Sequence, residues 1–148
     1  MTLLSIVVPA YNETESLPDL LENIHATVQT HGYAAEVIFI NDGSTDATAG
    51  VLENLATESR RHVHVIHFRS NRGKAAALTA GFQHATGDIV ITMDADLQDD
   101  PAEIPKLIDT LETGNYGLVS GWNTRARIPL KNAPSLLCST ASQRCSQA

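Results

Sequence analysis

Two aspartates and a carboxamide directly follow an apolar run in the middle of the chain. The run, residues 88–93, is short and rich in β-branched side chains, so it predicts a buried parallel strand. Asp94, Asp96 and Gln98 come next, at alternating positions. Ligands of open α/β sheets bind at the carboxyl ends of the strands. These oxygen donors therefore suit Mg²⁺ or Mn²⁺ holding a diphosphate, because a divalent ion that keeps several waters needs only one or two protein carboxylates.

Two further polar loops follow predicted strands. Residues 9–13 (Pro-Ala-Tyr-Asn-Glu) come after the first strand, and residues 41–46 (Asn-Asp-Gly-Ser-Thr-Asp) come after the second. In a doubly wound sheet of order 3-2-1-4, the first and fourth strands are neighbours and their carboxyl ends open a crevice. Taken alone, the segment 41–46 fits an ordinary turn and helix cap equally well. The convergence of three such loops on one sheet edge favours a ligand site.

Two cations stand at the start of a predicted helix, in Asn71-Arg72-Gly73-Lys74. Cations are not what the N-terminus of a helix prefers, so contact with a phosphate or a substrate is the functional interpretation. The alternative is a solvated turn in which Gly73 supplies backbone freedom.

Three histidines in the predicted third strand, His62, His64 and His67, raise the question of a metal site. No cysteine or further acid stands nearby in sequence, and a partly exposed strand is the favoured interpretation. The chain contains neither Gly-x-Ser-x-Gly nor Gly-x-Gly-x-x-Gly. A serine nucleophile elbow and a dinucleotide-binding Rossmann domain are therefore disfavoured.

The elements that must position these loops alternate along the chain between strand-like and helix-like patterns. This alternation predicts an α/β fold with a mostly parallel sheet and helices on both faces. The expected strands are residues 3–8, 36–40, 62–68, 88–93 and 116–121. The expected helices begin at a capping box formed by Ser16 and Asp19, include an alanine-rich helix over 74–85 that packs closely on the sheet, and end with one that Asp100 caps.

The bulk composition points to one acidic domain. The 148 residues carry a formal net charge of −7 and no basic stripe, which makes nucleic acid a poor partner. No apolar run reaches ~18 residues, and the first nine residues do not resemble a signal peptide. We expect one domain over residues 1–122 and an irregular tail over 123–148, which is either disordered or the product of a reading-frame slip. Cys138 and Cys145 both lie in that tail, so a reducing compartment is the simpler interpretation.

Together these motifs resemble family 2 glycosyltransferases of the GT-A fold. The resemblance rests on residues 6–13, 41–46, 71–74 and 94–99, and it covers residues 2–122. Leu97-Gln98 and the later Ser120-Gly121-Trp122 are most similar to the branch that makes polyprenyl-phosphate sugars, to which dolichyl-phosphate mannose synthase belongs. The resemblance also implies that the chain is truncated at its C-terminal end, because relatives continue with acceptor-site elements, an amphipathic helix and often transmembrane helices.

The resemblance implies a set of residues that line the nucleotide pocket or lie near the sugar donor. These are Pro9, Tyr11, Glu13, Asp42, Arg72 and Lys74. Asp42 in this set would contact the base or the ribose. Asn41, beside it, stands where many relatives carry a second aspartate, which implies slightly weaker nucleotide contact.

The resemblance further assigns the catalytic metal and the acceptor. Asp94 and Asp96 would be the catalytic carboxylates, and with Gln98 they would hold Mg²⁺ or Mn²⁺ and the donor diphosphate. Arg125 or Arg127 would meet the acceptor phosphate. The implied reaction moves a sugar from a nucleoside-diphosphate sugar to polyprenyl phosphate with inversion, and a lipid phosphate is already anionic and needs no general base. The implied location is cytoplasmic, at a membrane surface.

Two alternatives stay open at this point. One is a family 2 transferase that extends a polysaccharide and takes a base carboxylate from a further segment. The other is a nucleotide-binding fragment without catalysis.

Overall fold

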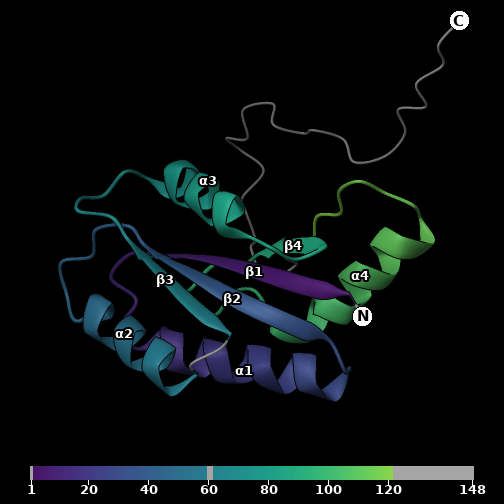
Figure 1. Cartoon of the computed structure of the whole chain (residues 1–148), viewed down its shortest axis with the longest axis horizontal. Helices are drawn as coiled ribbons and strands as arrows, with labels where there is room; N and C mark the ends of the chain where they lie inside the picture. The colour runs from purple at the N-terminus through teal and green to yellow at the C-terminus, as the bar shows by residue number, and fades with distance from the viewer. Residues whose placement is uncertain (1, 60–61, 122–148) are drawn as a thin grey trace, which may run out of the picture.

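The computed structural model describes residues 2–59 and 62–121 and shows a single parallel sheet between helices (Figure 1). The sheet has four strands in the order β3-β2-β1-β4, and all three neighbouring pairs are parallel. The predicted α/β class and strand order are confirmed. The strands are β1 (Leu3–Ala10), β2 (Ala34–Asn41), β3 (Val63–His67) and β4 (Ile89–Thr92).

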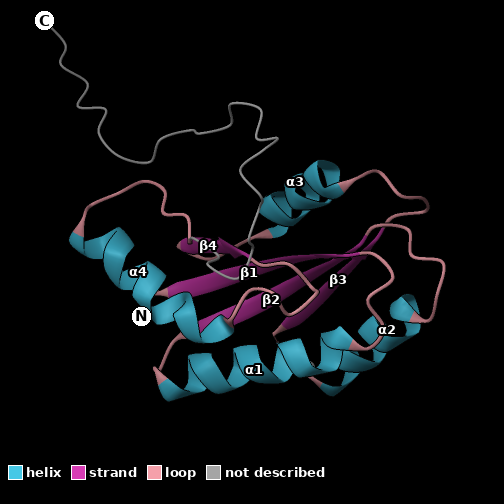
Figure 2. Cartoon of the chain, turned by 180° about the vertical axis from the view of Figure 1, so that it is seen from behind, coloured by secondary structure: helices cyan, strands magenta, loops and turns pink. Residues whose placement is uncertain are grey.

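Helices cover both faces of this sheet, as Figure 2 shows. On one face lie α1 (Ser16–Thr30), α2 (Thr48–Glu58) and α4 (Ile104–Thr113), the last preceded by a 3₁₀ turn over Pro101–Glu103. On the other face lies α3 (Lys74–His84). Right-handed βαβ crossovers place successive helices on opposite faces where the winding reverses, and here it reverses between β1 and β4. No helix within the described ranges is long and apolar enough to cross a membrane.

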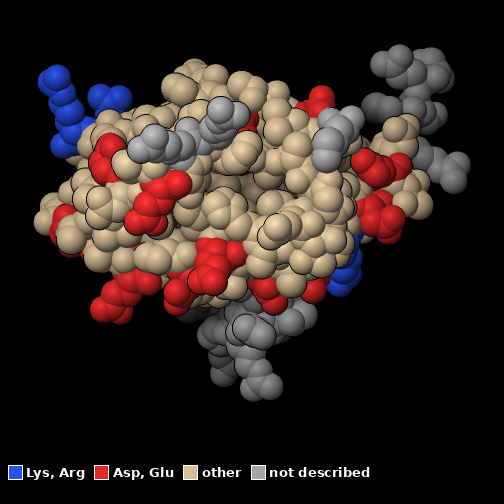
Figure 3. Space-filling view, turned by 60° about the horizontal axis from the view of Figure 1, so that its bottom comes forward, with Lys and Arg blue, Asp and Glu red and all other residues tan. Residues whose placement is uncertain are grey.

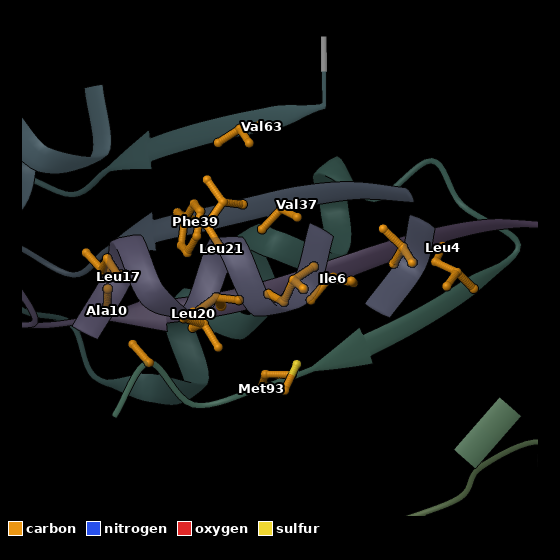
Figure 4. Close-up of a cluster of buried hydrophobic side chains, with 14 of the residues drawn as sticks. Leu4, Ile6, Ala10, Leu17, Leu20, Leu21, Val37, Phe39, Val63 and Met93 are labelled. Carbon is orange, nitrogen blue, oxygen red and sulfur yellow. The ribbon is translucent and has the colours of Figure 1, made fainter. Parts of the chain in front are cut away.

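The larger hydrophobic core lies between the sheet and α1 (Figure 4). In α1 the apolar residues recur at helical spacing and so form one stripe that faces the sheet. All five apolar positions predicted for this stripe are buried: Leu17, Leu20, Leu21, Ile24 and Val28. They pack on alternate residues of β1 and β2, which point to the same face because side chains alternate along a strand.

The smaller core lies under α3, where backbone and sheet approach each other closely. Ala77 is buried against Val7 and Ile40. A Cβ added at Gly81 would overlap Val7 and Ile40, so only glycine fits at that point of the contact. The predicted close packing of this alanine-rich helix is confirmed, and it holds α3 against β1 and β2.

The predicted capping box at the start of α1 is wrong. Ser16 is the first helical residue, the preceding Glu15 makes no side-chain cap, and Ser16 Oγ donates to Glu13 Oε2 at 3.0 Å. The turn before the helix is held by tertiary contacts instead, because Glu13 N donates to Thr48 Oγ1 at 2.9 Å. Contacts with the next βα unit thus override the local capping signal.

At α4 the predicted start is confirmed, since Asp100 accepts from Ala102 N at 3.0 Å and Pro101 opens the turn. The predicted strand over 116–121 is wrong, because none of these residues pairs with a described strand. Tyr116 N instead bonds back to Leu111 O, and Leu118 is 83 % exposed. A strand is stabilised by its pairing and its packing, and this segment has neither within the described residues.

Candidate functional site

The carboxyl ends of β1, β2 and β4 open into one cleft of about 280 Å³. It brings together seven of the predicted site residues: Pro9, Tyr11, Glu13, Asp42, Lys74, Asp94 and Asp96. Asn71 and Gly73 complete the polar part of its lining. Arg72 and Gln98 are not among the lining residues, and Arg125 and Arg127 lie outside the described residues.

Asp42 ties the loop after β2 to the loop before α3. Its side chain is buried, with the residue only 4 % exposed, and its two oxygens accept from Arg72 N at 2.7 Å and from Gly73 N at 2.9 Å. A carboxylate has about four lone-pair sites, so acceptor capacity remains toward the cleft. The residue predicted to meet the base or ribose therefore also holds the segment that carries Lys74.

Gly43 permits the close approach of these two loops. Its φ is +69°, and a Cβ there would overlap the backbone of Ser70 and Asn71. The positive φ and the missing side chain are both required, and only glycine supplies them together without strain. The glycine of the 41–46 motif thus has a packing role that brings Asn71 to the cleft.

The loop after β1 is bonded to the loop after β2 through Asn12. Asn12 adopts φ 57°, its N–H donates to Ser44 Oγ at 3.0 Å, and its Oδ1 accepts from Thr45 N at 2.9 Å. The sequence neighbours of Asn12, Tyr11 and Glu13, both line the cleft. Two loops far apart in sequence are therefore joined into one rim of the cleft.

The acidic loop after β4 closes on itself. Asp94 N donates to Asp99 Oδ2 at 2.9 Å, Gln98 N donates to Asp96 Oδ1 at 3.1 Å, and Leu97 between them has φ 60°. Asp94 Oδ1 also accepts from Lys74 Nζ at 2.5 Å. The loop thus turns the Asp94 carboxylate toward a cation at the start of α3.

The donor set fits a hard divalent ion that takes most of its ligands from elsewhere. Asp94 and Asp96 both line the cleft, where Asp94 accepts from Lys74 through Oδ1 and Asp96 accepts from Gln98 N through its own Oδ1. Within residues 2–59 and 62–121, no three His, Cys, Asp or Glu side chains gather as a complete metal site. Mg²⁺ is held in this way in many nucleotide sites, by one or two carboxylates together with phosphate oxygens and water.

Asp46, at the end of the 41–46 motif, serves the helix rather than the cleft. It accepts from Thr48 N at 2.9 Å at the start of α2 and from Thr14 Oγ1 at 2.7 Å. Hydrogen bonds from Thr48 and then Thr14 lower the pKa of the Asp46 carboxyl. The helix-cap interpretation of this motif is right for Asp46, whereas Asp42 lines the cleft.

A supporting group next to the 41–46 motif was not among the residues predicted from the sequence. Asn41 is buried and does not line the cleft, and its amide nitrogen lies 3.0 Å from His67 Nδ1. Glu53 of α2 lies on the other side of that ring, and Glu36 lies 3.6 Å from His64. The strand order was the available signal, because it pairs the last residue of β2 with the last residue of β3.

Comparison with known families gives one match that spans most of the chain. The model of Glycosyl transferase family 2 matches residues 5–138.

Among curated proteins, two similar relatives carry the same name. The undecaprenyl-phosphate 4-deoxy-4-formamido-L-arabinose transferase of Pseudomonas fluorescens is 41 % identical over 140 residues, which are 95 % of this chain and 41 % of that protein. The protein of the same name from Pectobacterium carotovorum is 44 % identical over 110 residues, which are 74 % of this chain and 34 % of that protein. The chain therefore spans less than half the length of these relatives.

Solved structures with the same architecture include two complexes with a nucleotide or nucleotide sugar. The mannosyltransferase PcManGT of Pyrobaculum calidifontis, in complex with GDP-Man and Mn²⁺, has a TM-score of 0.63 and 29 % identity over 73 % of this chain and 32 % of that one. Glucosyl-3-phosphoglycerate synthase of Mycobacterium tuberculosis, in complex with UDP, has a TM-score of 0.60 and 30 % identity over 76 % of this chain and 41 % of that one.

Proposed function

The chain belongs to glycosyl transferase family 2, and we propose that it binds a nucleoside-diphosphate sugar in the cleft at the ends of β1, β2 and β4. The sugar is then transferred, with inversion at the anomeric carbon, to polyprenyl phosphate. In this proposal residues 1–122 are the nucleotide-sugar-binding domain, and residues 123–148 are an irregular tail that lies outside the described residues.

The observation that carries the proposal is the meeting of three polar loops at one cleft. Residues more than eighty positions apart, such as Tyr11 and Asp94, line the same space of about 280 Å³. A ligand at the carboxyl ends of parallel strands, beside the point where the winding reverses, is the general rule for open α/β sheets.

The charge distribution explains why a cation has to accompany the donor. The chain carries a net charge of −7, and Figure 3 shows Asp and Glu side chains spread over the visible face with Lys and Arg near its two ends. A diphosphate would meet Asp94 and Asp96 directly, so charge has to be neutralised between them. Lys74, paired with Asp94, supplies one positive charge at this place.

Asp94 and Asp96 would hold Mg²⁺ or Mn²⁺ there. When bound, such an ion acts as a Lewis acid that stabilises negative charge on the departing diphosphate. The residues of the chain bind and orient the donor around it: the Asn12 bonds fix the rim that carries Tyr11 and Glu13, and Asp42 fixes the segment that carries Lys74.

Polyprenyl phosphate is the acceptor we propose, because the curated relatives are named as undecaprenyl-phosphate sugar transferases. A phosphate acceptor is anionic at neutral pH, so it attacks without a general base. Its lipid chain would bring the protein to a membrane surface, and a cytoplasmic face is the location we propose.

Two measurements test this function. Calorimetry with UDP and with GDP, each with and without Mn²⁺, is expected to show nucleotide binding that requires the metal. A transfer assay with a labelled nucleotide sugar and undecaprenyl phosphate then separates an active transferase from a fragment that binds nucleotide without turnover. Absence of binding to both nucleotides in the presence of Mn²⁺ would overturn the proposal.

A further inference from the structure

A series of hydrogen-bonded side chains connects α2 to the end of β2, outside the lining of the cleft. His67 Nε2 lies 2.7 Å from Glu53 Oε1, and His67 Nδ1 lies 3.0 Å from Asn41 Nδ2. Asn41 Oδ1 in turn accepts from Ser44 N at 3.0 Å. Glu53, His67 and Asn41 do not line the cleft, and the proposed function gives them no role.

The hydrogen bonds of this series allow only one position for the proton of a neutral His67 ring. Ser44 N–H is a donor, so the amide atom of Asn41 that faces it is the oxygen, and the nitrogen faces His67. An amide nitrogen only donates, so His67 Nδ1 has to accept and carries no proton. The proton of the neutral ring is then on Nε2, where it donates to Glu53.

We infer that His67 is a positioning residue for the nucleotide cleft: its ring, fixed as the Nε2–H tautomer, holds the Asn41 amide and through it the loop that follows β2. The inference rests on the proposed nucleotide binding for its functional part. Its structural part, the tautomer and the loop contact, stands on the geometry alone.

The position of Asn41 explains why one ring can affect the cleft. Asn41 is the last residue of β2 and is only 4 % exposed, and the next residue, Asp42, holds Arg72 N and lines the cleft. Ser44, which Asn41 bonds, accepts through its Oγ from Asn12 N on the opposite rim. A change in the Asn41 amide therefore reaches both loops that form the rim.

The charges around the ring make Asn41 and His67 a matched pair. Among the described residues, the charged group in contact with His67 is Glu53 from α2, and β2 presents the neutral Asn41 amide. An aspartate at position 41 would place an acceptor against Nδ1 as well. Nδ1 would then face a carboxylate, which only accepts, so we expect Asn41→Asp to place a proton on Nδ1 of His67.

Nitrogen NMR of histidine-labelled protein tests the tautomer directly. In the parent at mildly alkaline pH, we expect His67 Nδ1 to show the shift of an unprotonated nitrogen and Nε2 the shift of a protonated one. In Asn41→Asp, Nδ1 should show the shift of a protonated nitrogen at the same pH. A proton on Nδ1 of the parent ring, or an unprotonated Nδ1 in Asn41→Asp, overturns the inference.

Two substitutions at position 67 distinguish the role of His67 as a hydrogen-bond acceptor from its role in packing. His67→Asn keeps an acceptor for the Asn41 amide, whereas His67→Phe fills the space and removes it. We expect His67→Phe to bind UDP or GDP with Mn²⁺ roughly five-fold more weakly and to increase amide hydrogen exchange at Ser44. His67→Asn should stay close to the parent in both measurements.

His64→Phe is the matched control, because it changes a histidine of the same strand that contacts Glu36 and not the cleft loops. It should leave nucleotide affinity and the Ser44 exchange rate unchanged. Equal weakening by His67→Asn and His67→Phe overturns the positioning role. Hydrogen exchange at Ser44 reports on that role even if the parent binds neither nucleotide, so failure of the proposed function is recognised separately.

Discussion

Lys74 and Asp94 join the first residue of α3 to the loop after β4, with 2.5 Å between Lys74 Nζ and Asp94 Oδ1. The two side chains are 60 % and 45 % exposed, so water screens the pair strongly. Such a pair contributes at most about 1 kcal/mol to the free energy of unfolding. Its place at the cleft, rather than its strength, makes it informative, because it puts one cation beside Asp94 in the cleft proposed for the donor diphosphate.

We therefore predict that Lys74→Met changes binding much more than stability. The lost charge-assisted contact with phosphate should weaken UDP or GDP affinity in Mn²⁺ roughly ten-fold, whereas the free energy of unfolding changes by less than about 1 kcal/mol. Calorimetry and urea denaturation measure the two effects. The control is Lys106→Met, which removes a cation paired with Glu103 at 3.2 Å on α4, away from the cleft. If both variants bind the nucleotide like the parent, Lys74 has no role at the phosphate.

Asp96→Asn is predicted to weaken the part of nucleotide binding that depends on the metal. The amide keeps the size of the side chain and an acceptor for Gln98 N, but it removes the negative charge that a divalent ion needs. We expect affinity in Mn²⁺ to fall roughly ten-fold, while affinity without metal stays the same. Asp109→Asn, at an exposed position of α4, serves as the control. Equal metal dependence in Asp96→Asn and the parent would remove the metal assignment.

Much of the fold followed from local patterns. The apolar spacing of α1 placed its five buried residues correctly, and the alternation of elements led to the observed strand order. Strand ends were less accurate, since β1 runs on to Ala10 and β2 to Asn41. The two failures, the capping box at Ser16 and the strand over 116–121, occurred where a local signal met tertiary structure. Glu13 is held by Thr48, and no described strand pairs with the segment after α4.

The cleft shows the same division between local and long-range information. Position after a strand predicted Asp94 and Asp96 at the ligand edge of the sheet, and the resemblance to family 2 glycosyltransferases added Asp42; all three line the cleft. The bonds from Arg72 N and Gly73 N to Asp42 join segments thirty residues apart and have no local signature. Their detection needs the register of the sheet and the length of each loop, which residue types alone do not contain.

The buried carboxylate of Glu36, at the other end of the sheet, should make the free energy of unfolding depend on pH in the acid range. Burial raises the pKa of the Glu36 carboxyl, but hydrogen bonds from Ser5 and Thr86, with a smaller effect of His64, outweigh burial and leave that pKa below its ordinary value of 4.5. The unfolded chain therefore takes up this proton first as the pH falls. The contribution of Glu36 to the free energy of unfolding is complete above pH 4.5 and is lost as the pH falls through the folded-state pKa.

Urea denaturation at a series of pH values tests this dependence with Glu36→Gln. We expect the variant to be less stable than the parent at neutral pH and to approach it in acid, because only the parent loses a carboxylate contribution there. Glu22→Gln, an exposed glutamate on α1, should keep the acid dependence of the parent. A constant difference between Glu36→Gln and the parent across the whole pH series would contradict the prediction.

Gly43 and Gly32 offer a comparison that isolates the contact between the two cleft loops. Both adopt φ +69°, but a Cβ at Gly32 meets nothing within 4 Å, whereas one at Gly43 overlaps the backbone of Ser70 and Asn71. Gly32→Ala should therefore lower the free energy of unfolding only by the cost of the left-handed conformation, about 1–2 kcal/mol. Gly43→Ala should lower the free energy of unfolding by a further ~1–3 kcal/mol, because the backbone of the neighbouring loop has to move to make room. It should also weaken nucleotide binding, since the displaced segment carries Asn71 to the cleft. Denaturation and calorimetry on the two variants measure both effects, and equal losses in the two alanine variants would show that the approach of Gly43 to Ser70 does not hold the loops together.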